Sequence, residues 1–405
     1  MTSESKGGAT ALVSDSAVAV PIWLAAVGVS LVALNLRPPI TAISTLLHQV
    51  QQQEGFNSTV ASLLVAVPIA CWVGFSGLTP RIGRRVGLNR TIGFALIVLL
   101  VGFGIRMLPS VAALFVGTAI IGLAITVGNV LVPAAIKRDH PAHAGLLTGL
   151  YTMSLYIGAA AAAGITLPLQ HATGFGWRAT LGLWAVPVVV AWVVWFPQLR
   201  ARDHTGAATA PETGSPSLWR QPLAWAVTFF FAMPALLFYT VSAWLPTILM
   251  DAGMDASLAG GMLSVANLVA VPSALIMSIV SNRSAQQVWA AASTGALSAA
   301  AFVGLLISPT GWAVVWMVLL GAGLGAGTAI GYSLPLLRSR EAQTTAKLTA
   351  MSQIAGFALC AVGPVLAGAL HDLTHAWTAV LLLLVILAVV QIISGVRAGS
   401  ARFVS

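Results

Sequence analysis

Long apolar runs separated by short polar junctions make up nearly the whole chain. A run of about 20 mostly apolar residues is long enough to cross a bilayer as a helix. Cutting the sequence at its charged and turn-rich junctions gives twelve such runs, at residues 18–48, 57–80, 88–108, 111–136, 144–170, 177–196, 221–250, 256–280, 286–307, 312–337, 345–370 and 375–396. The pattern predicts an all-α membrane protein with twelve transmembrane helices.

The longest polar interruption divides these helices six and six. It contains RARDHTGAATAPETGSPS, a composition typical of a flexible linker. We expect a cytoplasmic tail at 1–17, an N-terminal half at 18–196, a linker at 197–220, a C-terminal half at 221–396 and a cytoplasmic tail at 397–405. The halves are weakly alike, since VPAAIKRD at 132–139 corresponds to LPLLRSRE at 334–341. Two related six-helix halves are typical of secondary transporters with a site midway across the membrane.

Positive charges are distributed asymmetrically between the two sides of these helices. If the N-terminus lies inside, 16 of the 19 Lys and Arg residues fall in inside segments. Arg106 and Arg178 fall at outside junctions, and Arg37 falls within a span. Because Lys and Arg collect in cytoplasmic loops, we expect both termini in the cytoplasm. The net charge of +9 then needs no nucleic-acid partner.

Composition excludes several other classes of protein. The chain is 58% hydrophobic and 7% charged, whereas soluble domains carry about 25% charged residues. Cys71 and Cys360 each lie in an apolar run, so neither a disulfide framework nor a metal site is indicated. No nucleotide-binding loop and no nucleophile or paired-carboxylate arrangement occurs within the spans. We expect no enzymatic activity, no cofactor and no metal. Glycine runs at 158–164 and 321–331 indicate close helix packing.

The stretch LVALNLRPPI at 31–40 places Asn35 and Arg37 inside an apolar run. An arginine at the membrane centre costs about 2.5 to 3.5 kcal/mol, so it usually faces a bundle interior or a water-filled cavity. Pro38 and Pro39 lack backbone N–H groups and should loosen the helix beside this charge. All ten acidic residues and all seven histidines fall at helix ends, in loops or in tails. We therefore expect an anionic or electron-rich solute to pair with Arg37, the alternative being a structural role against carbonyls and polar side chains.

Other polar or aromatic residues at similar depth could line the same cavity. The candidates for contact with the solute are Asn129, Tyr151, Tyr239, Trp244, Tyr332 and Gln353, beside Arg37 and Asn35. All four tyrosines of the chain, Tyr156 included, fall within spans rather than at their ends. Hydrogen bonding between packed helices is the alternative for each of these residues.

The junction GLTPRIGRR at 77–85 resembles the loop signature of the major facilitator superfamily. That signature normally has an acidic residue before its basic cluster, and Pro80 stands there in this chain. The resemblance makes the basic residues of this loop candidates for conformational contacts. The full set of gating candidates is Pro38, Arg81, Arg84, Arg85, Arg138 and Arg340.

Several further segments resemble the cyanate/nitroimidazole transporter (CynX/NimT) family of that superfamily. They are NLRP at 35–38, GNVLVPAAIKRDHP at 128–141, PLAW at 222–225, WLP at 244–246 and GPVLAGALHD at 363–372. The resemblance implies the major facilitator superfamily fold, inside termini, alternating access and a small polar or anionic solute. Asn35 and Arg37 match the family's helix-one motif, and Asn129 matches its helix-four motif.

These observations predict a secondary transporter of a small anionic or polar solute, such as a cyanate-like anion or a nitroimidazole-like compound. We expect a monomer in the bacterial cytoplasmic (inner) membrane. One alternative is an efflux carrier of neutral or cationic drug-like compounds, although the lack of an acid at depth disfavours cations. Another is a membrane receptor or scaffold that binds without transport, although the short linker and tails offer no sizeable soluble domain. The sequence leaves the direction of transport and any coupling ion open.

Overall fold

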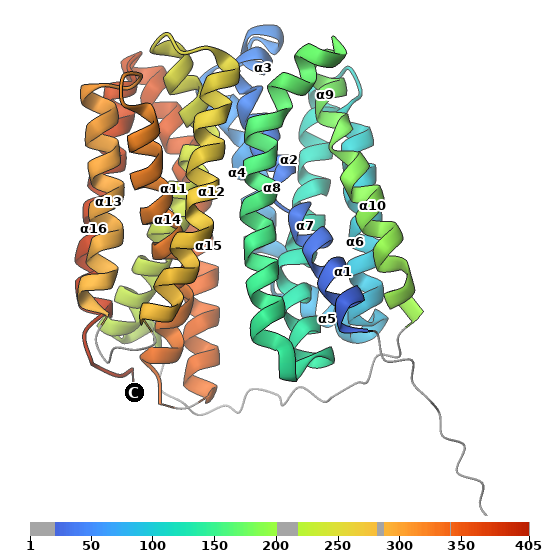
Figure 1. The fold of residues 1–405 in the computed structure, drawn as a ribbon, viewed down its shortest axis with the longest axis vertical. Coiled ribbons are helices and arrows are strands. Elements are labelled where there is room, and N and C mark those ends of the chain that lie inside the picture. The colour runs from blue at the N-terminus through green and yellow to red at the C-terminus, as the bar shows by residue number, and fades with distance from the viewer. Residues whose placement is uncertain (1–20, 201–217, 282–286, 341, 405) are drawn as a thin grey trace, which may run out of the picture.

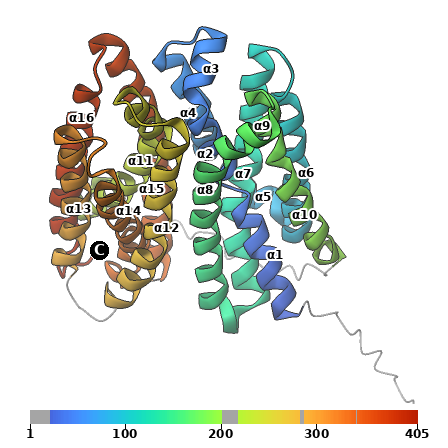
Figure 2. The ribbon, with the colours of Figure 1, turned by 45° about the horizontal axis from the view of Figure 1, so that its top comes forward.

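The computed structural model describes residues 21–200, 218–281, 287–340 and 342–404. Within these ranges, twelve helical segments are long and apolar enough to cross a membrane, which confirms the predicted number. Figures 1 and 2 show two helical bundles side by side, one blue to green and one yellow to red. The predicted tail at 1–17 and residues 201–217 of the predicted linker lie outside the described residues.

The first bundle is built from ten helices because some of its spans are broken. They are α1 (Ile22–Leu34), α2 (Pro38–Thr45), α3 (Leu47–Glu54), α4 (Ser58–Phe75), α5 (Thr79–Val86), α6 (Leu88–Arg106), α7 (Val111–Asp139), α8 (Ala144–Thr173), α9 (Trp177–Leu183) and α10 (Ala185–Trp195). The run at 18–48 was expected as one loosened helix and instead forms α1, α2 and α3. The run at 57–80 is also divided. Most of it forms α4, and its last residues form the beginning of the short basic helix α5.

The second bundle consists of six continuous helices. They are α11 (Pro222–Asp251), α12 (Ala256–Ser281), α13 (Val288–Ile307), α14 (Ala313–Leu337), α15 (Ala342–Thr374) and α16 (Trp377–Ala398). Their bounds lie within a few residues of the predicted ones. Helix α11 is the most deeply buried, with 83% of its membrane-spanning window inside the protein, because it packs against α14, α15 and α16.

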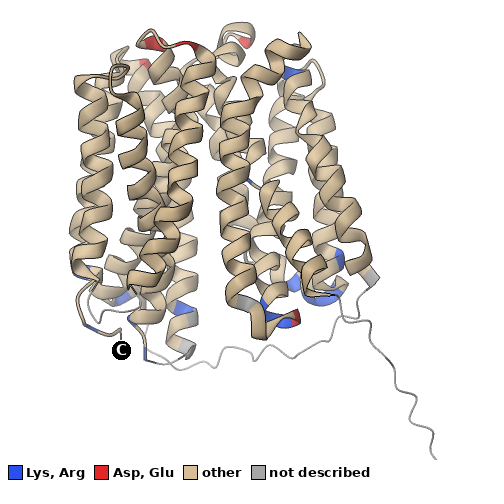
Figure 3. Ribbon diagram, viewed as in Figure 1, with Lys and Arg blue, Asp and Glu red and all other residues tan. Residues whose placement is uncertain are grey.

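The two ends of the molecule differ in charge, as Figure 3 shows. The end at which α1 begins and α16 finishes carries most of the described Lys and Arg side chains, and we call it the basic end. The described acidic side chains of Glu54, Asp251, Asp255 and Asp372 lie at the opposite, acidic end. Asp139 is at the basic end, where it accepts a hydrogen bond from Arg138 Nη2 at 2.9 Å. Lys6, Arg202 and Arg283 lie outside the described residues.

The two bundles are joined at the acidic end by one carboxylate. Asp372, near the end of α15, accepts hydrogen bonds from the backbone N–H groups of Ser58 at 2.9 Å and Thr59 at 2.7 Å. The Thr59 hydroxyl donates a third hydrogen bond at 2.6 Å. These donors belong to the first turn of α4, where a negative charge is favoured by the helix dipole. Asp372 therefore caps a helix of the other bundle.

The bundles also meet through small residues and, near the middle of the membrane, through rings. A Cβ atom on Gly260 of α12 would lie 2.6 Å from the Ala163 carbonyl oxygen of α8. Trp72 of α4 stacks on Phe357 of α15 with a centroid distance of 3.8 Å. Tyr156 of α8 donates to Thr328 Oγ1 of α14 at 3.2 Å. The contacts between the bundles thus run from the acidic end to about the middle.

Glycine allows the closest helix contacts within the second bundle. Gly321 and Gly325 of α14 face the carbonyl oxygens of Ala266 and Ala270 of α12. A Cβ atom would stand 2.3 Å from the first oxygen and 2.2 Å from the second, both shorter than any real contact. The glycine run at 321–331 therefore packs helices, as its sequence indicates.

We predict that Gly325→Ala destabilises the protein by about 1 to 3 kcal/mol, because the new methyl group forces α12 and α14 apart. Thermal unfolding of the protein in detergent measures this. Gly261→Ala is the matched control, since a Cβ atom there meets nothing within 4 Å and alanine favours a helix. Equal unfolding midpoints for the two variants would contradict the packing role of Gly325.

Candidate functional site

The break between α1 and α2 positions the most unusual residue of the chain. Pro38 and Pro39 occupy the first two positions of α2 and cannot donate to the last turn of α1. Asn35 is 1% exposed, and its side-chain amide donates to the carbonyl oxygens of Leu31 at 2.8 Å and of Pro187 in α10 at 3.2 Å. Asn35 therefore holds the broken end of α1 against α10.

Two other helices, α8 and α6, contact the backbone carbonyl groups at this break. The Leu34 carbonyl lies against Gly158 of α8, where a Cβ atom would come within 2.2 Å. Arg106, at the end of α6, is 2% exposed and donates from Nη1 to the Pro39 carbonyl at 2.9 Å. The sequence placed Arg106 at an outside junction, but its side chain points into the bundle and fixes α2. Three helices thus support the break.

Arg37 follows this break as the N-terminal flanking residue of α2. It stands 15 residues after Ile22, about 22 Å along a helix, and so lies deep within a hydrocarbon layer about 30 Å thick. Its guanidinium carbon is 4.6 Å from the ring centre of Tyr156 in α8 and 4.0 Å from that of Phe238 in α11. The Arg37 side chain thus lies between one aromatic ring from each bundle.

The donors of Arg37 are not used within the described part of the chain. No hydrogen bond or ion pair of its guanidinium group is found there, and Nη1 is buried without a partner. A guanidinium group carries five N–H donors, while each aromatic face contributes only about 0.5 to 2 kcal/mol. The two rings therefore offset part of the cost of burying this charge, and the N–H groups remain available to an acceptor.

Tyrosine hydroxyl groups surround this charge. Tyr151, Tyr239 and Tyr332 all lie within electrostatic range of Arg37. They come from α8, α11 and α14, so both bundles contribute. Tyr332 is 51% exposed although it lies in a membrane-spanning helix beside Phe231. Tyr332 is thus the exposed tyrosine near Arg37, whereas Tyr151 and Tyr239 are buried.

One hydrogen bond fixes the polar groups on the N-terminal side of the cluster. Tyr151 donates from its hydroxyl to Asn129 Oδ1 of α7 at 2.9 Å. Asn129 in turn donates from Nδ2 to the Ile125 carbonyl at 3.1 Å. The side-chain oxygen of Asn129 is thus held in one orientation, while the Tyr151 oxygen still has acceptor capacity.

Two other candidates lie away from this cluster. Trp244 is 1% exposed and donates from Nε1 to the Pro364 carbonyl of α15 at 2.9 Å, so its polar group is used in packing α11 against α15. Gln353 is partly buried on α15, one turn from Phe357, and no contact joins it to Arg37 in the described residues. Arg37, Asn129, Tyr151, Tyr239 and Tyr332 are the predicted residues that the structure brings together.

The gating candidates occupy different surroundings. Arg81, Arg84 and Arg85 are exposed on α5 at the basic end, and Pro38 is buried at the helix break. Arg340 lies 4.6 Å from the ring centre of Phe403 near the C-terminus. Its neighbour Arg338, which sequence reasoning missed, is 2% exposed and donates to the Ala398 and Gly399 carbonyls at 2.8 Å each.

Phe238 is the main functional candidate that the sequence did not reveal. It carries no polar group, and its only signal is its place beside Tyr239 in an apolar helix. Tyr156 was expected as a possible lining residue of the cavity but was not among the predicted solute contacts. Among the described residues, no group of three His, Cys, Asp or Glu side chains could hold a metal ion. The site can therefore bind an acceptor group by charge, hydrogen bonds and ring faces.

Comparisons with known proteins agree with this architecture. Residues 23–359 match the model of the Major Facilitator Superfamily. The chain is 36% identical to the Bacillus subtilis transporter YycB over 94% of both chains. It is 33% identical to the Escherichia coli 2-nitroimidazole transporter over 92% of this chain and 94% of that one. It is 28% identical to the Escherichia coli cyanate transport protein CynX over 85% and 89%.

A solved structure shares the fold at much lower sequence identity. A bacterial homologue of the human lysosomal transporter Spinster superposes with a TM-score of 0.73 at 13% identity, covering 93% of this chain and 96% of that one. The family match spans most of the chain, and the relatives named above are membrane transporters rather than enzymes. This multi-pass membrane protein therefore belongs to the Major Facilitator Superfamily of transporters.

Proposed function

We propose that this protein is a secondary transporter that moves a small anionic or polar solute across the bacterial cytoplasmic membrane. The observation that carries the proposal is Arg37, a charge deep in the membrane between the two bundles with unused donors. Hydrogen bonds to a charged group are worth about 1.5 to 3 kcal/mol. An anion or nitro group at Arg37 would thus relieve the cost of the buried charge and gain affinity.

The cluster supports two kinds of solute. A cyanate-like anion would accept hydrogen bonds from the Arg37 guanidinium, with Tyr151, Tyr239 and Tyr332 orienting it. A nitroimidazole-like compound would place its nitro group at the same guanidinium and its ring against aromatic side chains such as Tyr156. These solutes correspond to the names of the Escherichia coli relatives. Efflux of cations is disfavoured, because the fixed charge of Arg37 repels them.

In this proposal the bundles, residues 18–196 and 221–396, rock about the Arg37 site. The positive-inside rule directs the basic end, and with it both termini, toward the cytoplasm. The Asp372 contact then closes the outer side, and the half-exposed Tyr332 is reached from the cytoplasm. The exposed arginines of α5, together with Arg138 and Arg340, would form contacts in the opposite state. We further propose that a single chain is sufficient for transport.

We predict that Arg37→Ala lowers the initial rate of solute uptake by about 10- to 100-fold, because it removes the charge-assisted hydrogen bonds. Arg37→Lys keeps the charge but loses the planar fork, so an intermediate rate is expected. Uptake of labelled cyanate and of 2-nitroimidazole into liposomes containing the purified protein measures both. Arg90→Ala, an exposed arginine at the basic end, is the control. Unchanged rates in both Arg37 variants would refute the site.

We predict that Asp372→Asn favours the state that is open at the acidic end. The amide keeps the shape of the carboxylate but loses its charge and one acceptor. We expect a loss of roughly 1 to 2 kcal/mol from the closed state, which is 5- to 30-fold in population. Spin labels at Ala172→Cys and Thr310→Cys, both exposed at the acidic end, report the separation of the bundles. Cys71 and Cys360 are first replaced by alanine.

Asp255→Asn is the matched control for this experiment. Asp255 also caps a helix at the acidic end, accepting from the Ser257 backbone N–H at 2.8 Å, but both groups belong to the second bundle. Its substitution should leave the distance distribution unchanged. If both variants give the same distribution as the parent, Asp372 does not hold the bundles together.

A further inference from the structure

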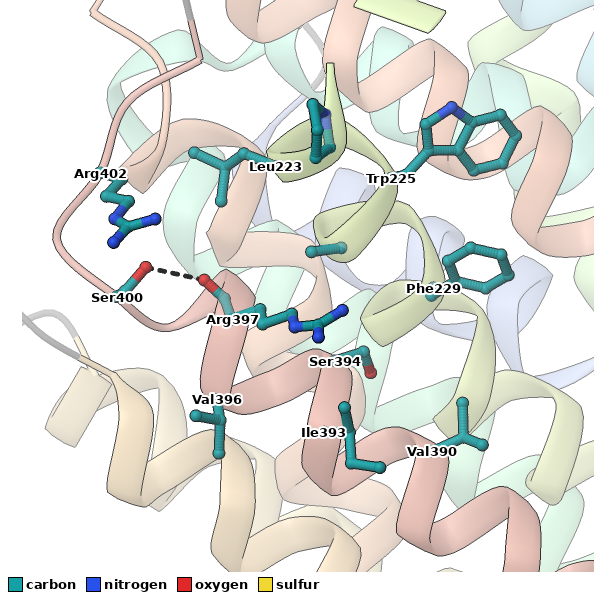
Figure 4. A pocket seen from close by; sticks show the side chains of 12 residues that line it. Leu223, Trp225, Phe229, Val390, Ile393, Ser394, Val396, Arg397, Ser400 and Arg402 are labelled. Atoms are coloured by element: carbon teal, nitrogen blue, oxygen red, sulfur yellow. Dashed lines mark hydrogen bonds between the residues drawn. The ribbon is translucent and has the colours of Figure 1, made fainter. Parts of the chain in front are cut away.

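One groove on the described surface lies outside the Arg37 site. It has a volume of about 760 Å³ and runs between α11 and α16 at the basic end, within the range of roughly 300 to 1,000 Å³ that is usual for ligand pockets. Figure 4 shows the side chains of both helices that form it. Its walls are mostly apolar, and two arginines, Arg397 and Arg402, belong to its lining.

We propose that this groove is a binding site for one anionic phospholipid, whose phosphate lies at Arg397 and Arg402 and whose acyl chain follows the apolar walls. The site is separate from the solute site, so it goes beyond the transport function proposed above. The argument rests on the depth of the lining residues, on the charge of the rim and on the fixed backbone that carries it.

The depth of the lining residues matches a phospholipid. Helix α16 has 22 residues and is therefore about 33 Å long, close to the hydrocarbon thickness of about 30 Å. Arg397 lies in its last turn, at the level of headgroups. Val390 and Ile393 lie one to two turns deeper and are 36% and 51% exposed. The groove is thus charged at headgroup level and apolar below it.

The wall formed by α11 has the same arrangement, with residues suited to the headgroup level at the basic end and apolar residues deeper in the membrane. Trp225 lines the groove in the first turn of α11, and its Nε1 donates to the carbonyl of Trp219, which precedes the helix, at 2.8 Å. Tryptophan is enriched at this level of a membrane. Phe229 continues the wall one turn deeper, with its ring centre 5.6 Å from that of Trp225. Headgroup level and chain level therefore coincide on both helices.

The charge of the rim is positive, and no residue that the structure describes compensates it. No described residue forms an ion pair or hydrogen bond with the side chain of Arg397 or of Arg402, and the described acids other than Asp139 lie at the acidic end. Two exposed cations beside an apolar groove would repel each other without an anion. Basic pockets between membrane helices on the cytoplasmic side are the usual sites for anionic lipid headgroups.

The chain that carries Arg402 is held in place. Arg338 fixes the end of α16 by its hydrogen bonds to the Ala398 and Gly399 carbonyls. The Ser400 hydroxyl donates to the Arg397 carbonyl at 2.8 Å, and the Val404 N–H donates to the Arg338 carbonyl at 2.8 Å. This short turn returns along α14 and keeps Arg402 beside the groove. Both arginines therefore belong to the rim of the groove, at separate points along it, so that a headgroup at this rim lies in the field of both charges.

Native mass spectrometry of the full chain in detergent tests this proposal, with dioleoyl phosphatidylglycerol and dioleoyl phosphatidylcholine as probes. We expect one phosphatidylglycerol to bind in preference to phosphatidylcholine. Each arginine near a membrane surface contributes about fivefold to anion affinity, so Arg397→Gln with Arg402→Gln should lower phosphatidylglycerol binding about 30-fold. Arg85→Gln with Arg90→Gln, two exposed arginines at the same end of the other bundle, should leave it unchanged.

Two further measurements separate a lipid site from other occupants. Ile393→Trp fills the apolar part of the groove, and we expect it to lower phosphatidylglycerol binding while both arginines remain. Millimolar inorganic phosphate should not displace the lipid. Equal binding of the two lipids, an equal loss in the Arg85/Arg90 control, or displacement by phosphate would each overturn the proposal. Chains that pair through this groove, seen as a dimer that lipid does not dissociate, would also overturn it.

Discussion

The cost of an unpaired charge inside a membrane governs the arrangement of this protein. Arg37 lies deep in the hydrocarbon layer, where no described carboxylate pairs with it. The surrounding structure lowers that cost with two aromatic faces, those of Tyr156 and Phe238. None of these groups supplies a full counter-charge, so the site stays complementary to an anion. A neutralising acid at the same depth would lower the free energy cost of burying Arg37, but it would also compete with the solute for the guanidinium group.

The helix break beside Arg37 is subject to the same constraint, because it too leaves polar groups without partners inside the membrane. Proline at positions 38 and 39 leaves carbonyl groups without helical donors, which is tolerated only where protein or water satisfies them. Asn35 and Arg106 bind backbone at this point, and Gly158 allows α8 to approach it closely. The break is therefore a rigid, supported feature. It carries the Arg37 backbone between the two bundles, where a straight helix would leave the side chain inside one of them.

Hydropathy and charge patterns were sufficient to predict the fold, because the bilayer allows few solutions. The number of spans, their approximate bounds and a loosening of the first span at Pro38 could be read from the sequence, but the full division of that span into α1, α2 and α3 could not. Nor could the surroundings of each polar residue. Asn35 and Trp244 have the polar groups expected of residues that line a cavity. Both side chains instead donate hydrogen bonds to backbone carbonyl groups of neighbouring helices. Phe238 and Tyr156 meet Arg37 only because α1, α8 and α11 converge, and no periodicity within one helix encodes that convergence.

The acid that joins the two bundles lies far from the Arg37 site. Among the described residues, Asp372 is the carboxylate that joins the bundles, and it lies at the far end of α15 from the basic side. Its hydrogen bonds hold the acidic end closed in the state that the structure describes. A solute bound at Arg37, as proposed, would contact residues of both bundles and so would favour states in which they lie close around it. In the proposed transport cycle, the balance between the Asp372 contact and the contacts of the solute would set which side of the membrane the site faces.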